Sequence, residues 1–285
     1  MDPISKRFNP ALTPGHTTQA LEGFVPHFQP IFIVVDDGHK ITGFETLARK
    51  QEQDVLHTPD MFLGTLKKNK LLPYLDMLMF QNACAFIDRA KETLENTGSA
   101  LPEHFHISVN ISPETLAHPN TRQTIAQCLE TYDVAPHHLT LEILEQPFIN
   151  QFTLAAIGAL SSAGHTISVD DYFQGHSNKA RVQSLGNAHG NIKIDYGVGE
   201  HLRTLDELKH LLNKHPILNK SPTLTIEGAQ NDLVTDVKAH AHLTDTLPKL
   251  HFQGFDLGLP QSPRAALALL TTDRSTAPEP HPPAL

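Results

Sequence analysis

The sequence predicts an α/β fold, a closed (β/α)8 barrel of the TIM type. Strand-like stretches rich in β-branched residues alternate along the chain with longer stretches of helical periodicity, which is typical of a largely parallel sheet. Eight such strands fall within about 250 residues, the usual length of one barrel. Polar residues recur at the ends of these strands with the same period, which also favours a barrel.

The elements follow one another in a regular order. Residues 27–35 and 40–47 read as two strands around the turn Asp36-Asp37-Gly38 and predict an antiparallel hairpin. Two helices are expected next, and Pro73 suits the first turn of the second, at 73–95. The remaining strands are expected at 105–109, 139–143, 166–169, 192–194, 223–226 and 250–253, and the remaining helices near 121–132, 152–163, 204–214 and after Asn231.

One barrel domain is expected over residues 21–270. Residues 1–20 are rich in proline and threonine and predict a poorly ordered lead-in. Residues 271–285 are rich in proline and poor in apolar side chains, which predicts a flexible tail. No second domain of recognisable type is expected, so regulation would come from expression, dimerisation or partners.

Composition narrows the classes of function. The chain has 22 Lys and Arg against 31 Asp and Glu, a net charge of -9, which argues against broad binding to nucleic acid or anionic lipid. A phosphate-bearing substrate would then need metal ions. The sequence has neither an apolar signal-peptide core nor a run of about 18 apolar residues, so we expect a cytoplasmic protein without a membrane span. Its two cysteines do not make a disulfide framework and predict reduced core residues.

Histidine is abundant, with 19 residues. Close pairs occur at His104 and His106, at 137–138, and at His240 and His242, but they lack the cysteine or carboxylate spacing of a zinc site. We therefore interpret them as scattered surface residues.

Polar residues end most of the predicted strands. In a β/α barrel the carboxyl ends of the strands meet on one face, which carries the active site. Any one of these residues could be an ordinary boundary residue, but their recurrence once per β/α unit predicts a shared concave site. The residues are Glu45, Asn110, Glu142, Asp170, Lys193, Asp195, Glu227 and Gln253.

The stretch 165–175, HTISVDDYFQG, holds two adjacent carboxylates. Neighbouring strand residues point to opposite faces, so Asp170 and Asp171 can converge on one cation only if the backbone leaves strand geometry between them. A solvated turn is the alternative, because aspartate is a common turn former.

The predicted cluster of carboxylates requires a positive partner, because like charges repel. Oxygen ligands without cysteine or histidine favour Mg²⁺ or Mn²⁺. Two such ions about 3.5–4 Å apart are the usual arrangement for phosphodiester hydrolysis. Lys193 could orient the attacking water or neutralise charge in the transition state, or could form a structural ion pair with Asp195.

Eight motifs occur in the order found in the EAL domain family of bacterial cyclic di-GMP phosphodiesterases, which the chain resembles over about residues 24–268. The resemblance covers essentially the whole predicted barrel, and so many ordered matches are not expected by chance. The motifs are FQPI at 28–31, GFETLAR at 43–49, SVNIS at 108–112, LEILE at 141–145, VDDYFQG at 169–175, IKID at 192–195, IEGAQ at 226–230 and FQGFDLGLP at 252–260.

The resemblance implies hydrolysis of cyclic di-GMP to linear pGpG in a barrel whose first strand runs antiparallel to the others. It implies two ions, Mg²⁺ or Mn²⁺, held by Glu45, Asn110, Glu142, Asp170 and Asp171. It implies that Glu45, Lys193, Glu227 and Gln253 act in catalysis by positioning water and inner-shell groups. It also implies nucleotide contacts from Gln29, Leu47, Arg49 and Asp195, and loop support from Glu145.

The sequence also departs from the family pattern, at Thr46, Leu144 and Gln230 and most strongly at 172–174. Where the family has Phe-Gly-Thr this chain has Tyr-Phe-Gln, and Phe173 replaces a glycine that can adopt positive φ freely. In the family this loop helps to place metals and to link subunits, so we expect a different path here.

Three functions therefore stay open. The first is an active phosphodiesterase, with a homodimer formed through the 170–175 region. The second is a degenerate EAL protein that binds cyclic di-GMP or a protein partner without hydrolysis. The third is a barrel enzyme for another phosphorylated metabolite. Retention of every implied metal ligand favours the first.

Overall fold

The computed structural model describes residues 20–35, 38–102, 104–143, 151–173, 179–195, 202–244 and 247–271. Almost all of the predicted lead-in at 1–20 and tail at 271–285 lies outside these residues, as do the turn residues Asp36 and Asp37, the site candidate Glu145, and Gln174 of the divergent loop.

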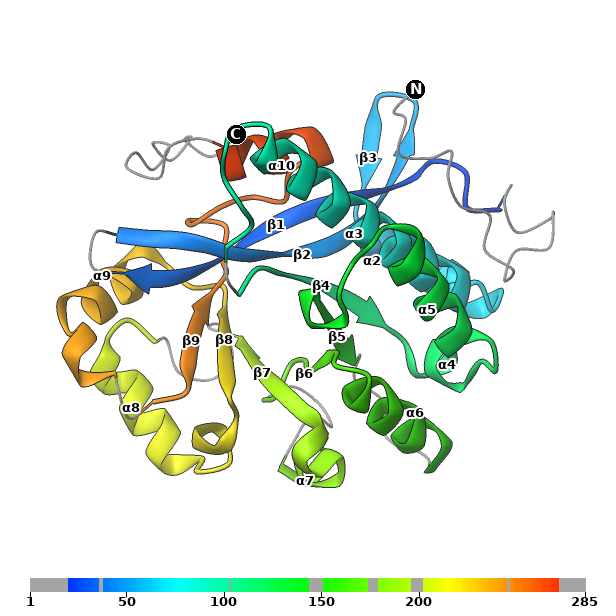
Figure 1. Cartoon of the computed structure of the whole chain (residues 1–285). Helices are drawn as coiled ribbons and strands as arrows, with labels where there is room; N and C mark the ends of the chain where they lie inside the picture. The colour runs from blue at the N-terminus through cyan, green and yellow to red at the C-terminus, as the bar shows by residue number, and fades with distance from the viewer. Residues whose placement is uncertain are drawn as a thin grey trace.

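The described strands form the predicted barrel (Figure 1). Their order around the sheet is β1-β9-β8-β7-β6-β5-β4-β2, and pairing between β1 and β2 closes the ring. The first strand runs antiparallel to both of its neighbours, while the other pairs within the ring are parallel, so the fold prediction is confirmed. The strands are β1 (Phe24–Val35), β2 (Gly38–Glu52), β4 (His106–Ile111), β5 (Leu139–Ile143), β6 (Thr166–Val169), β7 (His189–Asp195), β8 (Thr223–Glu227) and β9 (Lys249–Phe252).

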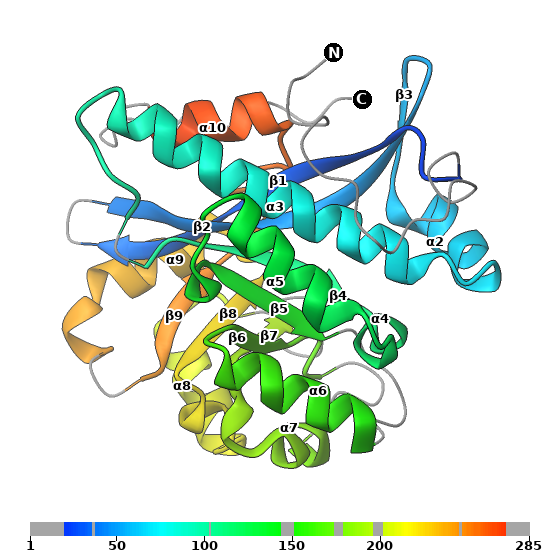
Figure 2. The ribbon, with the colours of Figure 1, turned by 45° about the vertical axis from the view of Figure 1, so that its right-hand side comes forward.

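Helices pack around this ring. Figure 2 shows α3 and α10 side by side over β1, and the two helices contact each other and that strand. The α-helices are α2 (Pro59–Lys68), α3 (Leu72–Glu95), α4 (Pro113–Ala117), α5 (Thr121–Thr131), α6 (Gln151–Ser162), α7 (Lys179–Leu185), α8 (Leu205–Lys214), α9 (Asn231–Ala239) and α10 (Pro263–Thr271). The short 3₁₀ turns are η2 (Pro136–His138), η3 (Gly186–Ala188), η4 (Leu218–Lys220) and η5 (Ala241–Leu243).

Every strand and helix placed in the sequence occurs near its predicted position. Pro73 lies in the first turn of α3, where its missing N–H costs no helical hydrogen bond. The start of α8 is fixed by a capping box, in which Thr204 accepts from the backbone N–H of Glu207 and the Glu207 carboxylate accepts from that of Thr204. The short strand β3 (Val55–His57) and the helices α4, α7 and α10 were not predicted.

The first hairpin is longer than the sequence suggests. Strand β2 runs on beyond the ring and pairs antiparallel with β3.

Gly43 lets β2 approach β4 closely, because a Cβ at this position would lie 2.2 Å from the backbone oxygen of His106. The close approach aligns Glu45 of β2 with Ser108 of β4.

The apolar core lies between the strand ring and the helices. The rings of Phe28 and Phe86 stack with centroids 4.2 Å apart and join β1 to α3, while the ring of Phe44 meets that of Phe86 edge-on. Alternate strand residues point outward into this layer, as strand geometry requires. Fully buried members of this set are Ile107, Val109, Ile111, Leu139, Leu141, Ile143, Ile167, Val169, Ile192, Ile194, Leu224 and Ile226.

The interior of the ring is polar. The amide of Asn191 donates to the hydroxyl of Ser168 at 2.9 Å, and the hydroxyl of Thr225 donates to the Asn191 carbonyl oxygen at 3.1 Å. Branched apolar residues usually fill a TIM-type interior. The polar interior leads to the candidate site at the carboxyl ends of the strands.

The interpretation of the histidines as surface residues is wrong in part. His165 and His251 are 4 % and 6 % exposed. The centroid of the His165 ring lies 6.3 Å from that of Phe80 on α3, and His251 is a residue of β9. None of the helices in the described part of the chain combines the length and apolar character that crossing a lipid bilayer requires.

Candidate active site

The strand-end residues gather around the ammonium group of Lys193, whose side chain is 1 % exposed. Its Nζ lies 2.9 Å from Glu142 Oε2 and 2.9 Å from Glu227 Oε1. It lies 3.3 Å from Glu45 Oε2 and 3.4 Å from Asp170 Oδ1. Strands β2, β5, β7 and β8 and the end of β6 thus contribute to one cluster of charged side chains.

Strand register explains this convergence. Asn110 of β4 is aligned with Glu142 of β5, and Asp195 of β7 is aligned with Glu227 of β8. Aligned residues on neighbouring parallel strands point to the same face of the sheet. The polar residues that the sequence places at separate strand ends therefore meet inside the carboxyl end of the ring.

Amide groups hold the Glu45 carboxylate in one orientation. Asn110 donates to Oε1 at 3.0 Å, and Gln253 donates to Oε2 at 2.7 Å. The Gln253 amide also donates to the side-chain oxygen of Gln29 at 3.2 Å, and Gln29 donates to the backbone oxygen of Gly258 at 3.2 Å. Two amides therefore hold the Glu45 carboxylate directly, and Gln29 of β1 contacts one of them.

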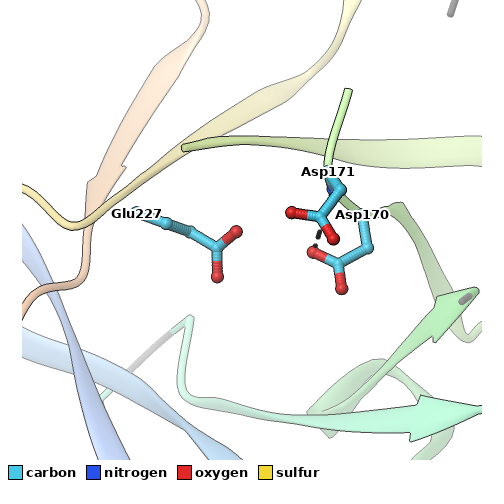
Figure 3. Close-up of side chains that lie close together, drawn as sticks. All are labelled: Asp170, Asp171 and Glu227. Carbon is cyan, nitrogen blue, oxygen red and sulfur yellow. Dashed lines mark hydrogen bonds between the residues drawn. The ribbon is translucent and has the colours of Figure 1, made fainter. Parts of the chain in front are cut away.

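Asp170 and Asp171 lie just after β6, where the backbone leaves strand geometry. Asp171 has φ +51°, and its backbone N–H donates to the Asp170 carboxylate at 3.2 Å. Figure 3 shows the carboxylates of Asp170 and Asp171 next to each other, across from that of Glu227. One carboxylate oxygen from each of the three residues lies within 4.8 Å of the others, so the two aspartates converge as the sequence required for a shared cation.

The electrostatics indicate a shortage of positive charge. Burial, and then the nearby Glu45 carboxylate, raise the pKa of Glu142 well above its usual range. Burial raises the pKa of Glu227 to about 8, although Lys193 opposes the shift. Burial disfavours the charged form of Lys193, but the four surrounding carboxylates outweigh it and raise the pKa of its ammonium well above the usual value.

Glu45 differs from the other carboxyl groups. Burial alone would raise its pKa, but Lys193 and the amides of Gln253 and Asn110 together lower it. Glu45 is therefore held as a carboxylate.

These residues fit a hard divalent cation. Glu142 Oε1 is buried and has no hydrogen-bond partner among the described residues. A carboxylate oxygen left in this way costs about 1–3 kcal/mol unless a donor or a cation contacts it. The donor set around it consists of carboxylate and amide oxygens, which Mg²⁺ and Mn²⁺ prefer.

A cavity of about 510 Å³ opens beside the cluster. Gln29, Leu47 and Asp195 line it together with Glu45, Asp171, Glu227 and Gln253. Arg49 is not among its described lining residues, and its guanidinium donates instead to the backbone oxygen of Ala48 at 2.8 Å. Leu47 therefore lies on the cavity wall, while the nucleotide contact implied for Arg49 stays a prediction.

Sequence reasoning missed part of the cavity wall. Phe255, which is 71 % exposed, and Asp256 line the cavity from the segment after β9. Gly254 brings this segment against the segment after β8, because a Cβ there would lie 2.1 Å from the backbone oxygen of Ala229. The glycine of the string FQGFD is a partial signal, since glycine at a strand can mark the close approach of another backbone, but it does not identify the segment that approaches or the exposure of Phe255.

The divergent loop begins with ordinary backbone. Phe173 is not among the described residues with positive φ, and its ring packs edge-on against His215 with centroids 4.9 Å apart. Tyr172 is buried and its backbone N–H donates to the Lys193 oxygen at 3.1 Å. Phenylalanine thus replaces glycine without backbone strain at this position.

Comparisons with known proteins agree with the resemblance found in the sequence. The family model described as "EAL domain" matches residues 16–206. The chain is 29% identical over 163 residues to "Probable cyclic di-GMP phosphodiesterase PdeB" of Escherichia coli, which covers 56% of this chain and 29% of that protein. It is 28% identical over 259 residues to "Bifunctional diguanylate cyclase/cyclic di-GMP phosphodiesterase MucR" of Pseudomonas aeruginosa, which covers 88% of this chain and 35% of that protein.

A solved structure agrees in fold. "Structure of EAL Enzyme Bd1971 - cAMP and cyclic-di-GMP bound form" matches with a TM-score of 0.73 at 20% identity, over 90% of this chain and 66% of that one. The match spans 29% of the length of PdeB and 35% of the length of MucR. The match to the family model covers most of the described barrel, and the chain belongs to the EAL domain family.

Proposed function

We propose that this protein is a phosphodiesterase that hydrolyses cyclic di-GMP to linear pGpG with two Mg²⁺ or Mn²⁺ ions. The observation that carries the proposal is the convergence of Glu45, Glu142, Asp170 and Glu227 on Lys193 beside a cavity of about 510 Å³. That volume suits a ligand of nucleotide size. The names of the EAL relatives supply the substrate class.

The chain offers a specific set of ligands. Glu45, Asn110, Glu142, Asp170 and Asp171 would hold the two ions, and Glu227 lies close enough to Asp170 and Asp171 to join them. When bound, such ions polarise the phosphodiester and lower the pKa of a water molecule.

The protein's own side chains would orient the reaction. Asn110 and Gln253 keep the Glu45 carboxylate in position through hydrogen bonds of 3.0 and 2.7 Å. The Lys193 ammonium stays protonated and offsets the carboxylate charge, which would otherwise repel the phosphate. Gln29, Leu47 and Asp195 line the cavity and would contact the nucleotide.

The test is hydrolysis of cyclic di-GMP by the purified chain. We expect pGpG to form with Mg²⁺ or Mn²⁺ and not with a chelator, when the products are separated by chromatography. Glu45→Gln should reduce the rate by about 100-fold or more, since it removes a charged ligand and a hydrogen-bond acceptor. Glu130→Gln, on the exposed face of α5, is the matched control and should retain the wild-type rate.

The result separates the two EAL functions. Binding of cyclic di-GMP without pGpG would reject the enzyme and support the degenerate, binding-only protein. Turnover that persists in chelator would reject the metal-dependent mechanism.

A further inference from the structure

A second cavity, of about 240 Å³, lies at the amino ends of the barrel strands. His106, Thr166, Thr223 and Lys249 are the first residues of β4, β6, β8 and β9, and all four line it. The carboxyl ends of these parallel strands carry the candidate active site. The two cavities therefore open at opposite ends of the same ring, and we call the second one the histidine cavity.

The two ends carry opposite charge. The described lining of the histidine cavity includes Lys249 and no carboxylate. The described lining of the active-site cavity includes Glu45, Asp171, Asp195, Glu227 and Asp256. An anion that enters the barrel is thus favoured at the amino end and repelled at the other. The histidines of the amino-end cavity are His104, His106, His137 and His251.

One lining residue has an unmet hydrogen-bonding group. His251 is 6 % exposed, and its Nε2 is buried without a hydrogen-bond partner in the described part of the chain. Buried polar groups in native proteins are nearly always hydrogen-bonded, so an unpartnered nitrogen in a cavity wall indicates that a further group binds there.

The arrangement does not suit a metal ion. The rings of His106 and His251 lie stacked, with centroids 5.3 Å apart and planes 20° from parallel. Nearly parallel imidazoles direct their ring nitrogens along parallel lines, whereas two ligands of one cation must converge. Among the described residues, the one group of three metal-ligand side chains lies at the other end, at 170, 171 and 227.

The histidine cavity instead offers hydrogen-bond donors. Burial is the main cause that lowers the pKa of His106 to about 4 and that of His251 well below its usual value, and the charge of Lys249 adds to both shifts. A neutral imidazole keeps one N–H to donate. That of His106 is directed to the backbone oxygen of His104, 3.3 Å from Nδ1, so His251, whose Nε2 has no partner among the described residues, is the imidazole that can donate to a ligand. Three residues that carry hydroxyl groups also line the cavity, Thr140, Thr166 and Thr223.

We propose that the histidine cavity binds a small oxyanion, either inorganic phosphate or the phosphate group of a small phosphomonoester, through Lys249, His251 and the threonine hydroxyls. Its volume of about 240 Å³ is below the usual range of about 300–1,000 Å³ for sites of drug-sized ligands, which excludes a dinucleotide. The site is thus separate from the one that would take cyclic di-GMP.

The test is calorimetric titration of the whole chain with inorganic phosphate in the presence of a chelator. Without divalent ions the acidic active site repels phosphate, so saturable binding reports on the histidine cavity. Lys249→Gln should weaken binding about 10-fold, because it removes a charge-assisted hydrogen bond. Lys249 is exposed, so this variant should fold normally. Lys67→Gln, on exposed α2, is the matched control and should bind as the wild type does.

A second titration, with glycerol phosphate, identifies the source of the oxyanion. Tighter binding of glycerol phosphate than of inorganic phosphate assigns the cavity to a phosphomonoester, and the reverse order assigns it to free phosphate. No saturable binding of either probe to the wild-type protein overturns the proposal. Equal affinity in wild type and Lys249→Gln overturns it as well. Neither outcome depends on hydrolysis of cyclic di-GMP.

Discussion

The ammonium of Lys193 lies 2.9 Å from Oε2 of Glu142, and both side chains are 1 % exposed. An ion pair this deep in a protein gains little over a well-packed apolar pair, because both charges have lost their hydration. Loss of one partner is costly, however, since it leaves the other charge buried and unpaired. Here one ammonium lies within 3.4 Å of four carboxylates, so its loss would leave all four without this positive partner.

We therefore predict that Lys193→Met destabilises the metal-free protein by about 3–5 kcal/mol, measured by urea unfolding. Methionine keeps most of the side-chain length but no charge. Saturating Mn²⁺ should restore more stability to this variant than to the wild type, because the added cations neutralise the same carboxylates. Lys67→Met, on an exposed face, controls for loss of a lysine, and equal stability of Lys193→Met and wild type would contradict the prediction.

The contact between Gly254 and Ala229 gives a second prediction. A methyl group at 254 would lie 2.1 Å from the Ala229 oxygen, so the segments after β8 and β9 must separate. Gln253 would then move away from Glu45, and we expect Gly254→Ala to reduce kcat/KM for cyclic di-GMP by about 100-fold. It should also lower the unfolding free energy by about 1–3 kcal/mol.

The matched control is Gly158→Ala in the interior of α6. Nothing lies within 4 Å of a Cβ at this position, so alanine should stabilise the helix by about 0.5–1 kcal/mol and leave activity unchanged. Similar effects of the two substitutions would contradict the steric explanation.

The sequence predicted the barrel and the convergence of its strand ends because both follow from periodicity. Glu142 and Asn110 could be placed together once β4 and β5 were assigned, since neighbouring parallel strands align their ends. The wall formed by Phe255 depends on the close approach of two loops, and the local sequence around Gly254 does not identify the second loop. The burial of His251 was missed for a related reason: an inward position near the start of a strand looks the same in sequence as a surface position.

Phe255 supports a third prediction. An aromatic ring that is 71 % exposed at the edge of a cavity is placed to stack on a nucleotide base. Stacking contributes about 1–3 kcal/mol per base, so Phe255→Ala should raise KM for cyclic di-GMP about 10-fold with little change in kcat. Phe152→Ala, at a ring that is 72 % exposed on α6, is the control and should leave KM unchanged. A fall in kcat at constant KM would argue against stacking.

Asp76 is a buried carboxyl group that takes no part in the candidate site. It lies on α3, is 6 % exposed, and accepts a hydrogen bond from the backbone N–H of Ser112 at 2.7 Å and another from the Thr115 hydroxyl. It thereby ties α3 to Ser112, which lies between β4 and α4, and to Thr115 of α4 itself. Burial raises its pKa to about 6, although these hydrogen bonds favour the charged form and oppose the shift.

This shift makes stability depend on pH. The folded state holds the Asp76 proton up to about pH 6, whereas an ordinary aspartate releases it near 3.8. The protonated group therefore contributes stability that is complete below about pH 4 and is lost as pH rises through 6, by about 3 kcal/mol in total. Asp76→Asn cannot titrate, so the unfolding free energy of wild type relative to this variant should fall by that amount between pH 4 and 7 in urea titrations. For the control Glu130→Gln, the difference in unfolding free energy from wild type should not change between pH 4 and 7. If the difference for Asp76→Asn is also constant over this range, Asp76 titrates as an ordinary aspartate and the prediction is wrong.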